Sequence, residues 1–141
     1  PRPAACFPAV PWPAERLAGI DQVAAPGDAV ILDARPAERF RGAPDPWDPR
    51  AGHIPGARSL PCRENLDPTG RFLPVAALRQ RFADVGVGAM TSVISSCGSG
   101  VTACHTLLAL ELVDGAPGRL YPGSWSEWSR DPDRPVATGI Q

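Results

Sequence analysis

The stretch SVISSCGSGVTACHTLLALEL, residues 92–112, places a cysteine between two patterns that predict different structures. The apolar run before Cys97 is typical of a short buried strand, and the leucine-rich segment after it predicts a helix over 101–115. Gly98 and Gly100 lie between the two, where they let the backbone turn its N–H groups toward one point. The stretch therefore predicts a thiol above the N-terminus of a helix.

Cys97 is a candidate nucleophile because of where this turn places its sulfur. A helix N-terminus presents free N–H groups and the positive end of the helix dipole, and both stabilise a thiolate. Thr102 is placed to cap the helix with its hydroxyl group. The alternative for Cys97 is a buried cysteine that packs as a small apolar side chain.

Three other kinds of cysteine site fit the sequence less well. A phosphatase loop needs an arginine six residues after the cysteine, where this chain has Ala103. A cysteine protease or acyltransferase needs a histidine with an orienting group, and neither His53 nor His105 stands in such a context. A zinc site built from Cys97, Cys104 and His105 lacks the usual ligand spacing. We therefore expect no metal at this loop.

Composition and charge limit the partners. The chain has 141 residues, 43% of them hydrophobic, which is the size and apolar content of one ordinary domain. Its net charge of −1 indicates no nucleic-acid partner, and no apolar run reaches the roughly 18 residues of a membrane span. All 14 cationic residues are arginines, which bind planar anions through paired hydrogen bonds. The four cysteines form no CxxC pair, which predicts free thiols in a reducing, cytoplasmic setting.

Apolar runs and helical spacing alternate along the chain. Residues 1–13 are proline-rich and predict a linker, and a first residue other than methionine indicates a fragment or a processed product. The expected elements are helices over 13–20, 36–42, 74–87, 101–115 and 124–130, strands over 27–35, 58–62, 91–97 and 118–123, and a loop over 43–57. This alternation predicts an α/β fold with a parallel sheet. Cys97 and Asp33 both follow strands, so we expect them at the carboxyl edge of the sheet, where such folds place active sites.

Four segments between residues 32 and 128 make the chain similar to a known family. They are LDARPAERFRG, AGHIPGARSLP, ISSCGSGVTAC and LYPGSWSEW. In this order they resemble the rhodanese family of sulfurtransferases, in the form of the catalytic C-terminal half of a tandem-domain enzyme. The resemblance implies a five-stranded parallel sheet with helices on both faces. It also implies that residues 14–141 are a rhodanese catalytic domain that packs against an N-terminal rhodanese domain outside this chain.

The resemblance also assigns chemical roles to individual residues. Cys97 is the nucleophile that forms a persulfide, and Ser99 hydrogen-bonds the departing group or relays a proton. The N–H cradle around the sulfur comes from Gly98, Ser99, Gly100, Val101 and Thr102. Arg39 binds the substrate carboxylate. Arg50 either adds a second substrate contact or only covers the surface.

Further positions are expected to support the fold. Asp33 and Arg35 match a strand-end pair that holds the loop, and His53 matches a histidine that fixes a turn. Ser124 is a possible helix cap. Packing is the expected role of Cys104, His105, Trp125 and Trp128. A pocket wall is the alternative for the two tryptophans.

The loop sequence also bears on the sulfur donor. Thiosulfate sulfurtransferases typically carry Cys-Arg-Lys-Gly-Val-Thr, whereas the form Cys-Gly-Ser-Gly-Val-Thr resembles the 3-mercaptopyruvate sulfurtransferases. Two cations would compensate the thiosulfate dianion, and a neutral loop suffices for the single carboxylate of 3-mercaptopyruvate. We therefore expect sulfur transfer from 3-mercaptopyruvate through a Cys97 persulfide to cyanide, a thiol or thioredoxin. No cofactor or metal is needed for this reaction. Two alternatives stay open: thiosulfate as the donor, and a non-catalytic module that carries a persulfide.

Overall fold

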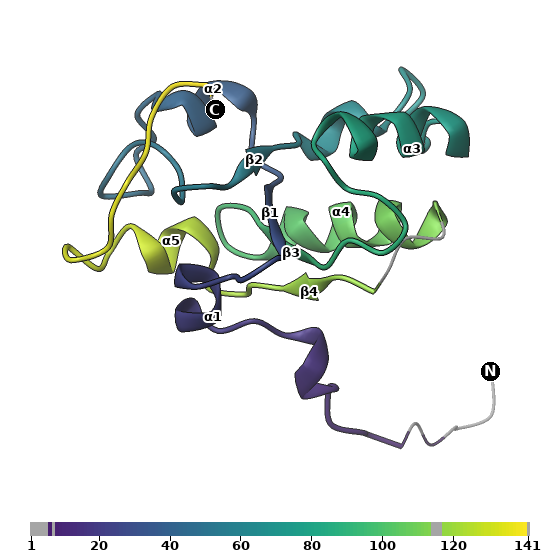
Figure 1. Cartoon of the computed structure of the whole chain (residues 1–141), viewed down its shortest axis with the longest axis horizontal. Helices are drawn as coiled ribbons and strands as arrows, with labels where there is room; N and C mark the ends of the chain where they lie inside the picture. The colour runs from purple at the N-terminus through teal and green to yellow at the C-terminus, as the bar shows by residue number, and fades with distance from the viewer. Residues whose placement is uncertain (1–5, 7, 114–116, 141) are drawn as a thin grey trace, which may run out of the picture.

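The computed structural model describes residues 6, 8–113 and 117–140. The helices are α1 Ile20–Ala24, α2 Ala37–Arg41, α3 Val75–Asp84, α4 Val101–Leu112 and α5 Ser124–Trp128, with short 3₁₀ helices η1 Ala14–Arg16 and η2 Cys62–Asn65. The strands are β1 Val30–Asp33, β2 Arg58–Ser59, β3 Val93–Ser96 and β4 Arg119–Leu120. Strands and helices alternate along the chain, which confirms the predicted α/β class (Figure 1).

The strands form one parallel sheet in the order β2-β1-β3-β4. β1 and β3 pair over their full lengths, and Asp33 lies opposite Ser96 at their carboxyl ends. Cys97 follows Ser96 directly, so the sulfur and the Asp33 carboxylate start from the same edge of the sheet. The predicted placement of both residues at this edge is confirmed.

The family resemblance implies a fifth strand without placing it, and beside β4 the structure has a single further pair of residues. Leu17 forms a parallel bridge with Leu120 beside β4, and the N–H of Ala18 donates to the carbonyl of Leu120 at 2.8 Å. The chain leaves the sheet after this pair because Gly19 begins α1, where its N–H donates to Gln22 Oε1 at 2.9 Å. The described sheet therefore has four strands, and the prediction of five is wrong by one.

Two apolar layers cover the opposite faces of the sheet. Successive residues of a strand point to opposite faces, so Ile31 and Ile94 pack in one layer while Leu32 and Val93 pack in the other. The first layer receives α1, α2 and α5, and the second receives α3 and α4. Figure 1 shows α3 and α4 on one side of the strands and α1 and α5 on the other. Helices thus cover both faces, as predicted.

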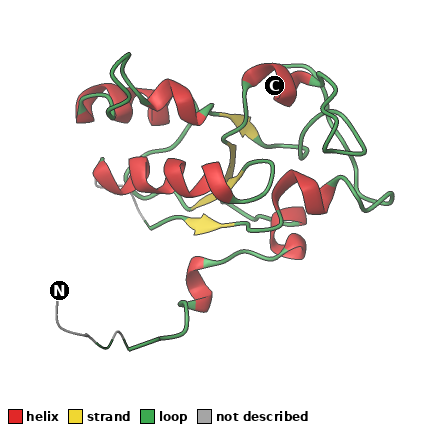
Figure 2. Cartoon of the chain, turned by 180° about the vertical axis from the view of Figure 1, so that it is seen from behind, coloured by secondary structure: helices red, strands yellow, loops and turns green. Residues whose placement is uncertain are grey.

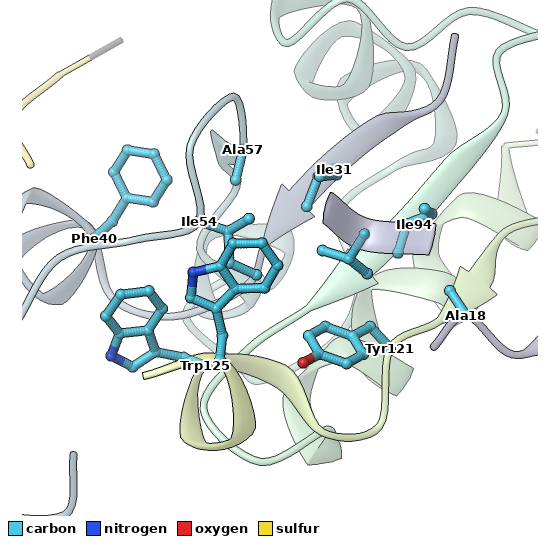
Figure 3. Packing of buried hydrophobic residues seen from close by; sticks show 10 residues of the cluster. Ala18, Ile31, Phe40, Ile54, Ala57, Ile94, Tyr121 and Trp125 are labelled. Atoms are coloured by element: carbon cyan, nitrogen blue, oxygen red, sulfur yellow. The ribbon is translucent and has the colours of Figure 1, made fainter. Parts of the chain in front are cut away.

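Aromatic side chains fill the layer beneath α5. Tyr121 and Trp125 are each 1% exposed, and they pack with Ile31, Ile94 and Phe40 (Figure 3). Burial of rings of this size contributes most of the apolar area of a small core. The predicted packing role of Trp125 is therefore what the structure shows, and this packing fixes α5 against the carboxyl edge of the sheet.

Two predicted elements are shorter in the structure. The helix predicted over 13–20 is only η1, because the backbone is already extended at Leu17 (φ −113°, ψ 149°), which pairs with Leu120 beside β4. The strand predicted over 58–62 ends at Ser59, because Pro61 has no N–H for a strand ladder and leads into η2. The first difference comes from a contact with a distant part of the chain, and the second from the local restriction at proline.

Two predictions reach past the described part of the chain. Residues 8–13 of the predicted linker contain no helix or strand, whereas 1–5 and 7 lie outside the described residues. The helix predicted over 101–115 is α4, and its predicted end at Gly115 also lies outside them. Among the described helices, none combines the length and the apolar character needed to cross a membrane.

The loop between α2 and β2, residues 43–57, runs beside the C-terminal segment. His53 and Ala137 form an antiparallel bridge in which each N–H donates to the other carbonyl, at 2.8 and 3.0 Å. The N–H of Gly139 donates to the carbonyl of Arg41 at 3.0 Å. Figure 2 shows the two segments as neighbouring loops next to α5. The loop is therefore held between α2 and the end of the chain.

Candidate active site

Cys97 lies in a tight loop between β3 and α4. Its side chain is buried, with the residue 2% exposed, and α4 begins four residues later at Val101. Gly100 is the N-cap of α4 and is left-handed, with φ of 83°. The prediction of Thr102 as the cap is therefore wrong, because Gly100 is the N-cap and the helix begins at Val101, before Thr102. Thr102 lies in the first turn of α4 and is exposed.

The other loop residues differ in exposure. Ser99 and Val101 are exposed, and Gly98 is half-buried. Cys104 is exposed on the first turns of α4, where its Sγ donates to the carbonyl of Gly100 at 3.4 Å. The predicted cradle residues thus occupy the loop after Cys97 and the first turn of α4, and the loop is open to solvent at Ser99.

Helix α5 holds this loop in place from the opposite side. The N–H of Trp125 donates to the carbonyl of Cys97 at 3.0 Å, and the N–H of Ser126 donates to the carbonyl of Gly98 at 2.9 Å. Ser124 Oγ accepts the N–H of Cys97 at 3.1 Å and donates to the carbonyl of Tyr121 at 2.8 Å. The start of α5 therefore fixes the backbone on which the Cys97 sulfur stands.

Ser124 is a residue whose role the sequence does not reveal. It is fully buried, and it has a positive φ of 52°, which is rare outside glycine. Its Oγ lies 4.0 Å from Cys97 Sγ. Gly123, and not Ser124, is the N-cap of α5, so the predicted capping role is wrong. Its position four residues after the end of β4, at the same sheet edge as Cys97, is the only available signal.

Replacing Gly100 with alanine should lower the stability of the fold and distort the backbone of the Cys97 loop. An added Cβ would lie 2.7 Å from the carbonyl oxygen of Pro122, and the φ of 83° disfavours any side chain. We expect the free energy of unfolding to fall by about 2 kcal/mol or more. Urea unfolding measures the change. Gly70→Ala is the matched control, because Gly70 has the same φ with no atom within 4 Å. Equal losses in both variants would contradict a role for the Pro122 contact.

Asp33 and Arg35 form a buried ion pair at the end of β1. The two residues are 2% and 3% exposed, and Arg35 Nη2 lies 2.7 Å from Asp33 Oδ2. The same nitrogen donates to the carbonyl of Gly52 at 2.7 Å, and the guanidinium stacks over the Trp125 ring at 4.9 Å. The pair therefore joins the end of β1 to the 43–57 loop and to α5, and α5 borders the Cys97 loop.

Arg39 extends from α2 toward the Cys97 loop. A Cβ built on Gly98 would lie 3.9 Å from Arg39 Nη2 and 4.0 Å from Nη1, so the guanidinium borders the loop. Asp45 Oδ2 lies 3.0 Å from Arg39 Nε, and Asp48 Oδ2 lies 2.7 Å from Nη2. The structure therefore brings the predicted carboxylate-binding arginine and the nucleophile loop together, with two carboxylates behind the arginine.

Arg50 has a different environment from the one considered for substrate binding. Its guanidinium donates to four backbone carbonyls, those of Trp128, Ser129, Asp131 and Arg134. Its own carbonyl accepts the indole N–H of Trp125 at 3.1 Å. The last carbonyls of a helix lack hydrogen-bond donors within the helix. At the end of α5, the Arg50 guanidinium provides these donors. These bonds make Arg50 a structural clamp between the 43–57 loop and the segment after α5, and a contact with the substrate stays a prediction.

The two histidines are held in apolar surroundings. Burial lowers the pKa of His53, and Nδ1 donates to the carbonyl of Phe40 at 2.7 Å. The rings of His53 and Phe40 stack with centroids 3.6 Å apart. Burial also lowers the pKa of His105, whose ring packs on Phe72 at 4.6 Å. Both histidines pack as structural groups, which is the role expected for them.

Solved structures share this fold. The anaerobic ergothioneine biosynthesis enzyme from Chlorobium limicola superposes with a TM-score of 0.83 at 22% sequence identity, over 90% of this chain and 33% of that chain. A likeness at this level of identity describes the arrangement of strands and helices. It does not indicate which reaction is catalysed, for which more similar relatives are needed.

Closer relatives carry sulfurtransferase names. A "Probable 3-mercaptopyruvate sulfurtransferase" of Pseudomonas aeruginosa is 54% identical over 119 residues, 84% of this chain and 42% of the relative. A "Putative thiosulfate sulfurtransferase" of Mycobacterium tuberculosis is 46% identical over 125 residues, which are 89% of this chain and 44% of the relative. The Escherichia coli 3-mercaptopyruvate sulfurtransferase is 46% identical over 110 residues, 77% of this chain and 39% of that protein.

These relatives are longer than the chain, which spans about two fifths of their length. The family model described as a rhodanese-like domain matches residues 18–131. The match includes β1, the Cys97 loop and α5, which together form the site described above. The chain therefore belongs to the rhodanese-like domain family.

Proposed function

We propose that the chain transfers sulfur from 3-mercaptopyruvate to a thiophilic acceptor through a persulfide on Cys97. The observation that carries the proposal is the Arg39 guanidinium beside the backbone of the Cys97 loop. The loop offers a sulfur at a helix N-terminus, and Arg39 offers a cation for a small carboxylate. A cyanide ion serves as the acceptor in an assay, and a thiol or thioredoxin is the proposed acceptor in a cell. The proposed reaction uses no cofactor.

The reaction proceeds in two balanced steps. The Cys97 thiolate attacks the sulfur of 3-mercaptopyruvate, forming an S–S bond while the C–S bond breaks. The electron pair of that bond stays on the carbon, which takes the proton of the donor thiol and leaves as pyruvate. Cyanide then attacks the outer sulfur, and the S–S bond breaks to give thiocyanate and the Cys97 thiolate. N–H groups at the start of α4 stabilise the anionic sulfur in both steps.

The charge of the loop supports 3-mercaptopyruvate as the donor. Gly98 and Ser99 are uncharged, and Arg39 is the arginine that borders the loop at Gly98. One guanidinium matches the single carboxylate of 3-mercaptopyruvate. Thiosulfate, a dianion, is the second candidate donor, because the Mycobacterium tuberculosis relative has a thiosulfate sulfurtransferase name.

A comparison of the two donors tests the proposal. The rate of thiocyanate formation is measured with each donor over a range of concentrations, with cyanide as the acceptor. We expect kcat/KM to be higher for 3-mercaptopyruvate than for thiosulfate. A higher value for thiosulfate would support the second candidate. Absence of turnover with both donors would contradict sulfur transfer by this chain.

Replacing Arg39 with alanine should weaken donor binding. Loss of a charge-assisted pair to a carboxylate costs about 1.5–3 kcal/mol, which corresponds to a rise of about 10-fold or more in KM for 3-mercaptopyruvate. Steady-state kinetics measure this change, with kcat expected to fall less than kcat/KM. Arg41→Ala is the control, since Arg41 is exposed on the same helix. An unchanged KM in the Arg39 variant would remove Arg39 from the donor site.

A further inference from the structure

We propose that Asp48 positions Arg39 and makes the donor site select a singly charged sulfur donor over a doubly charged one. The inference rests on the proposed function and concerns the same site. Asp48 belongs to the loop between α2 and β2, which the sequence marks only as proline-rich. Nothing in its sequence context separates it from the neighbouring surface carboxylates, so its role emerges from the fold.

Asp48 is a buried carboxylate with two well-defined partners. Its side chain is only 3% exposed. Oδ2 accepts a hydrogen bond from Arg39 Nη2 at 2.7 Å, and Oδ1 accepts one from Ser126 Oγ at 3.1 Å. The N–H of Ser126 in turn donates to the carbonyl of Gly98. Asp48 thus connects the donor-binding arginine to the helix that holds the nucleophile loop.

These bonds hold the Arg39 guanidinium in one orientation beside the loop. Asp45 contacts Nε and Asp48 contacts Nη2 of Arg39. Nη2 and Nη1 lie at nearly the same distance from a Cβ built on Gly98, 3.9 and 4.0 Å. A donor carboxylate entering above Cys97 would therefore meet an arginine that is already fixed next to the loop. This orientation lowers the entropy that the arginine loses when the donor binds.

The same carboxylates set the charge of the site. Two carboxylates surround one guanidinium, so the cluster of Arg39, Asp45 and Asp48 carries one net negative charge. A fixed negative charge repels a dianion twice as strongly as a monoanion at the same distance. The burial of Asp48 reduces the screening of its charge by solvent and salt. Thiosulfate is therefore penalised relative to 3-mercaptopyruvate, although both are anions.

The test is the replacement of Asp48 with asparagine in the full chain. The amide keeps an oxygen to accept from Arg39 and gains N–H donors toward Ser126 Oγ, so the packing is retained while the charge is removed. We measure kcat/KM for both donors with cyanide as the acceptor. The ratio of the thiosulfate value to the 3-mercaptopyruvate value should rise by about 10-fold, equivalent to about 1.4 kcal/mol.

Two further variants separate charge from structure. Asp45→Asn removes the same charge from a more exposed side chain, and it should raise the ratio in the same direction by a smaller factor. Should the Asp48 variant fail to fold, the Asp45 variant carries the test. Asp84→Asn removes a charge from an exposed position of α3, and it should leave the ratio of the two kcat/KM values unchanged.

The outcomes distinguish this inference from the function on which it rests. An active wild-type chain with an unchanged donor ratio in both the Asp48 and Asp45 variants would overturn the inference and leave the proposed function standing. Equal losses for both donors in Asp48→Asn would show that Asp48 only holds the structure, which also overturns the selection. A wild-type chain inactive with either donor would overturn both.

Discussion

Replacing Cys97 with serine should reduce sulfur transfer by about a thousandfold or more, equivalent to a loss of about 4 kcal/mol of transition-state stabilisation. A serine hydroxyl is a far weaker nucleophile than a thiolate, and it cannot form the persulfide that carries the sulfur between the two steps. The backbone of the loop should be unaffected, because its hydrogen bonds to Ser124, Trp125 and Ser126 come from main-chain atoms of residues 97 and 98. The measurement is thiocyanate formation from 3-mercaptopyruvate and cyanide.

Cys104→Ser is the matched control for that variant. Cys104 lies on α4, and a serine hydroxyl can still donate to the carbonyl of Gly100. We expect this variant to retain activity within about twofold, which is a small difference in activation free energy. Turnover by Cys97→Ser well above about a thousandth of the wild-type rate, or loss of activity in Cys104→Ser with an intact fold, would contradict the assignment of Cys97 as the nucleophile.

Replacing Asp33 with alanine should strongly destabilise the fold. In the wild-type structure the Arg35 side chain is only 3% exposed. The change leaves this buried guanidinium without its carboxylate. Breaking a buried ion pair from one side costs about 3–5 kcal/mol, a large part of the roughly 5–15 kcal/mol that stabilises a typical domain. Equilibrium unfolding in urea or guanidinium chloride measures the loss. Activity should fall as well, because Arg35 also contacts Gly52 and the Trp125 ring beside the Cys97 loop.

An exposed ion pair provides the comparison for Asp33. Arg134 Nη2 lies 2.8 Å from Asp21 Oδ1, a distance like that of the buried pair, but the Asp21 side chain is 89% exposed. Surface pairs of this kind contribute about 0–1 kcal/mol, so Asp21→Ala should change stability little. If the two alanine variants lost the same free energy of unfolding, burial of the Asp33–Arg35 pair could not be the source of its contribution.

The parts of the site that the sequence predicts are those set by local pattern. The apolar run before Cys97 forms β3 and the leucine-rich run after it forms α4, because strand and helix periodicities are properties of adjacent residues. The parallel alternation then requires Asp33 and Cys97 to meet at one edge. Left-handed Gly100 could be anticipated only as a glycine with freedom to turn, and it takes the N-cap position that was predicted for Thr102.

The parts that the sequence does not predict depend on contacts between distant segments. Ser124 reaches the backbone of Cys97 only because α5 packs against the sheet through Trp125. Arg50 meets the end of α5 from a loop more than seventy residues earlier, and its four carbonyl partners have no sequence signature. Asp48 is similar, since its burial follows from Arg39 and Ser126 on two different helices.

The most direct test is the mass of the chain after exposure to 3-mercaptopyruvate without an acceptor. We expect the peptide containing Cys97 to gain the mass of one sulfur atom, cyanide to remove it, and Cys97→Ser to gain none. Pyruvate should appear in equal amount. A gain of sulfur on Cys62 or Cys104 instead, or no gain on Cys97 while pyruvate is released, would contradict a persulfide on Cys97 as the carrier of the transferred sulfur.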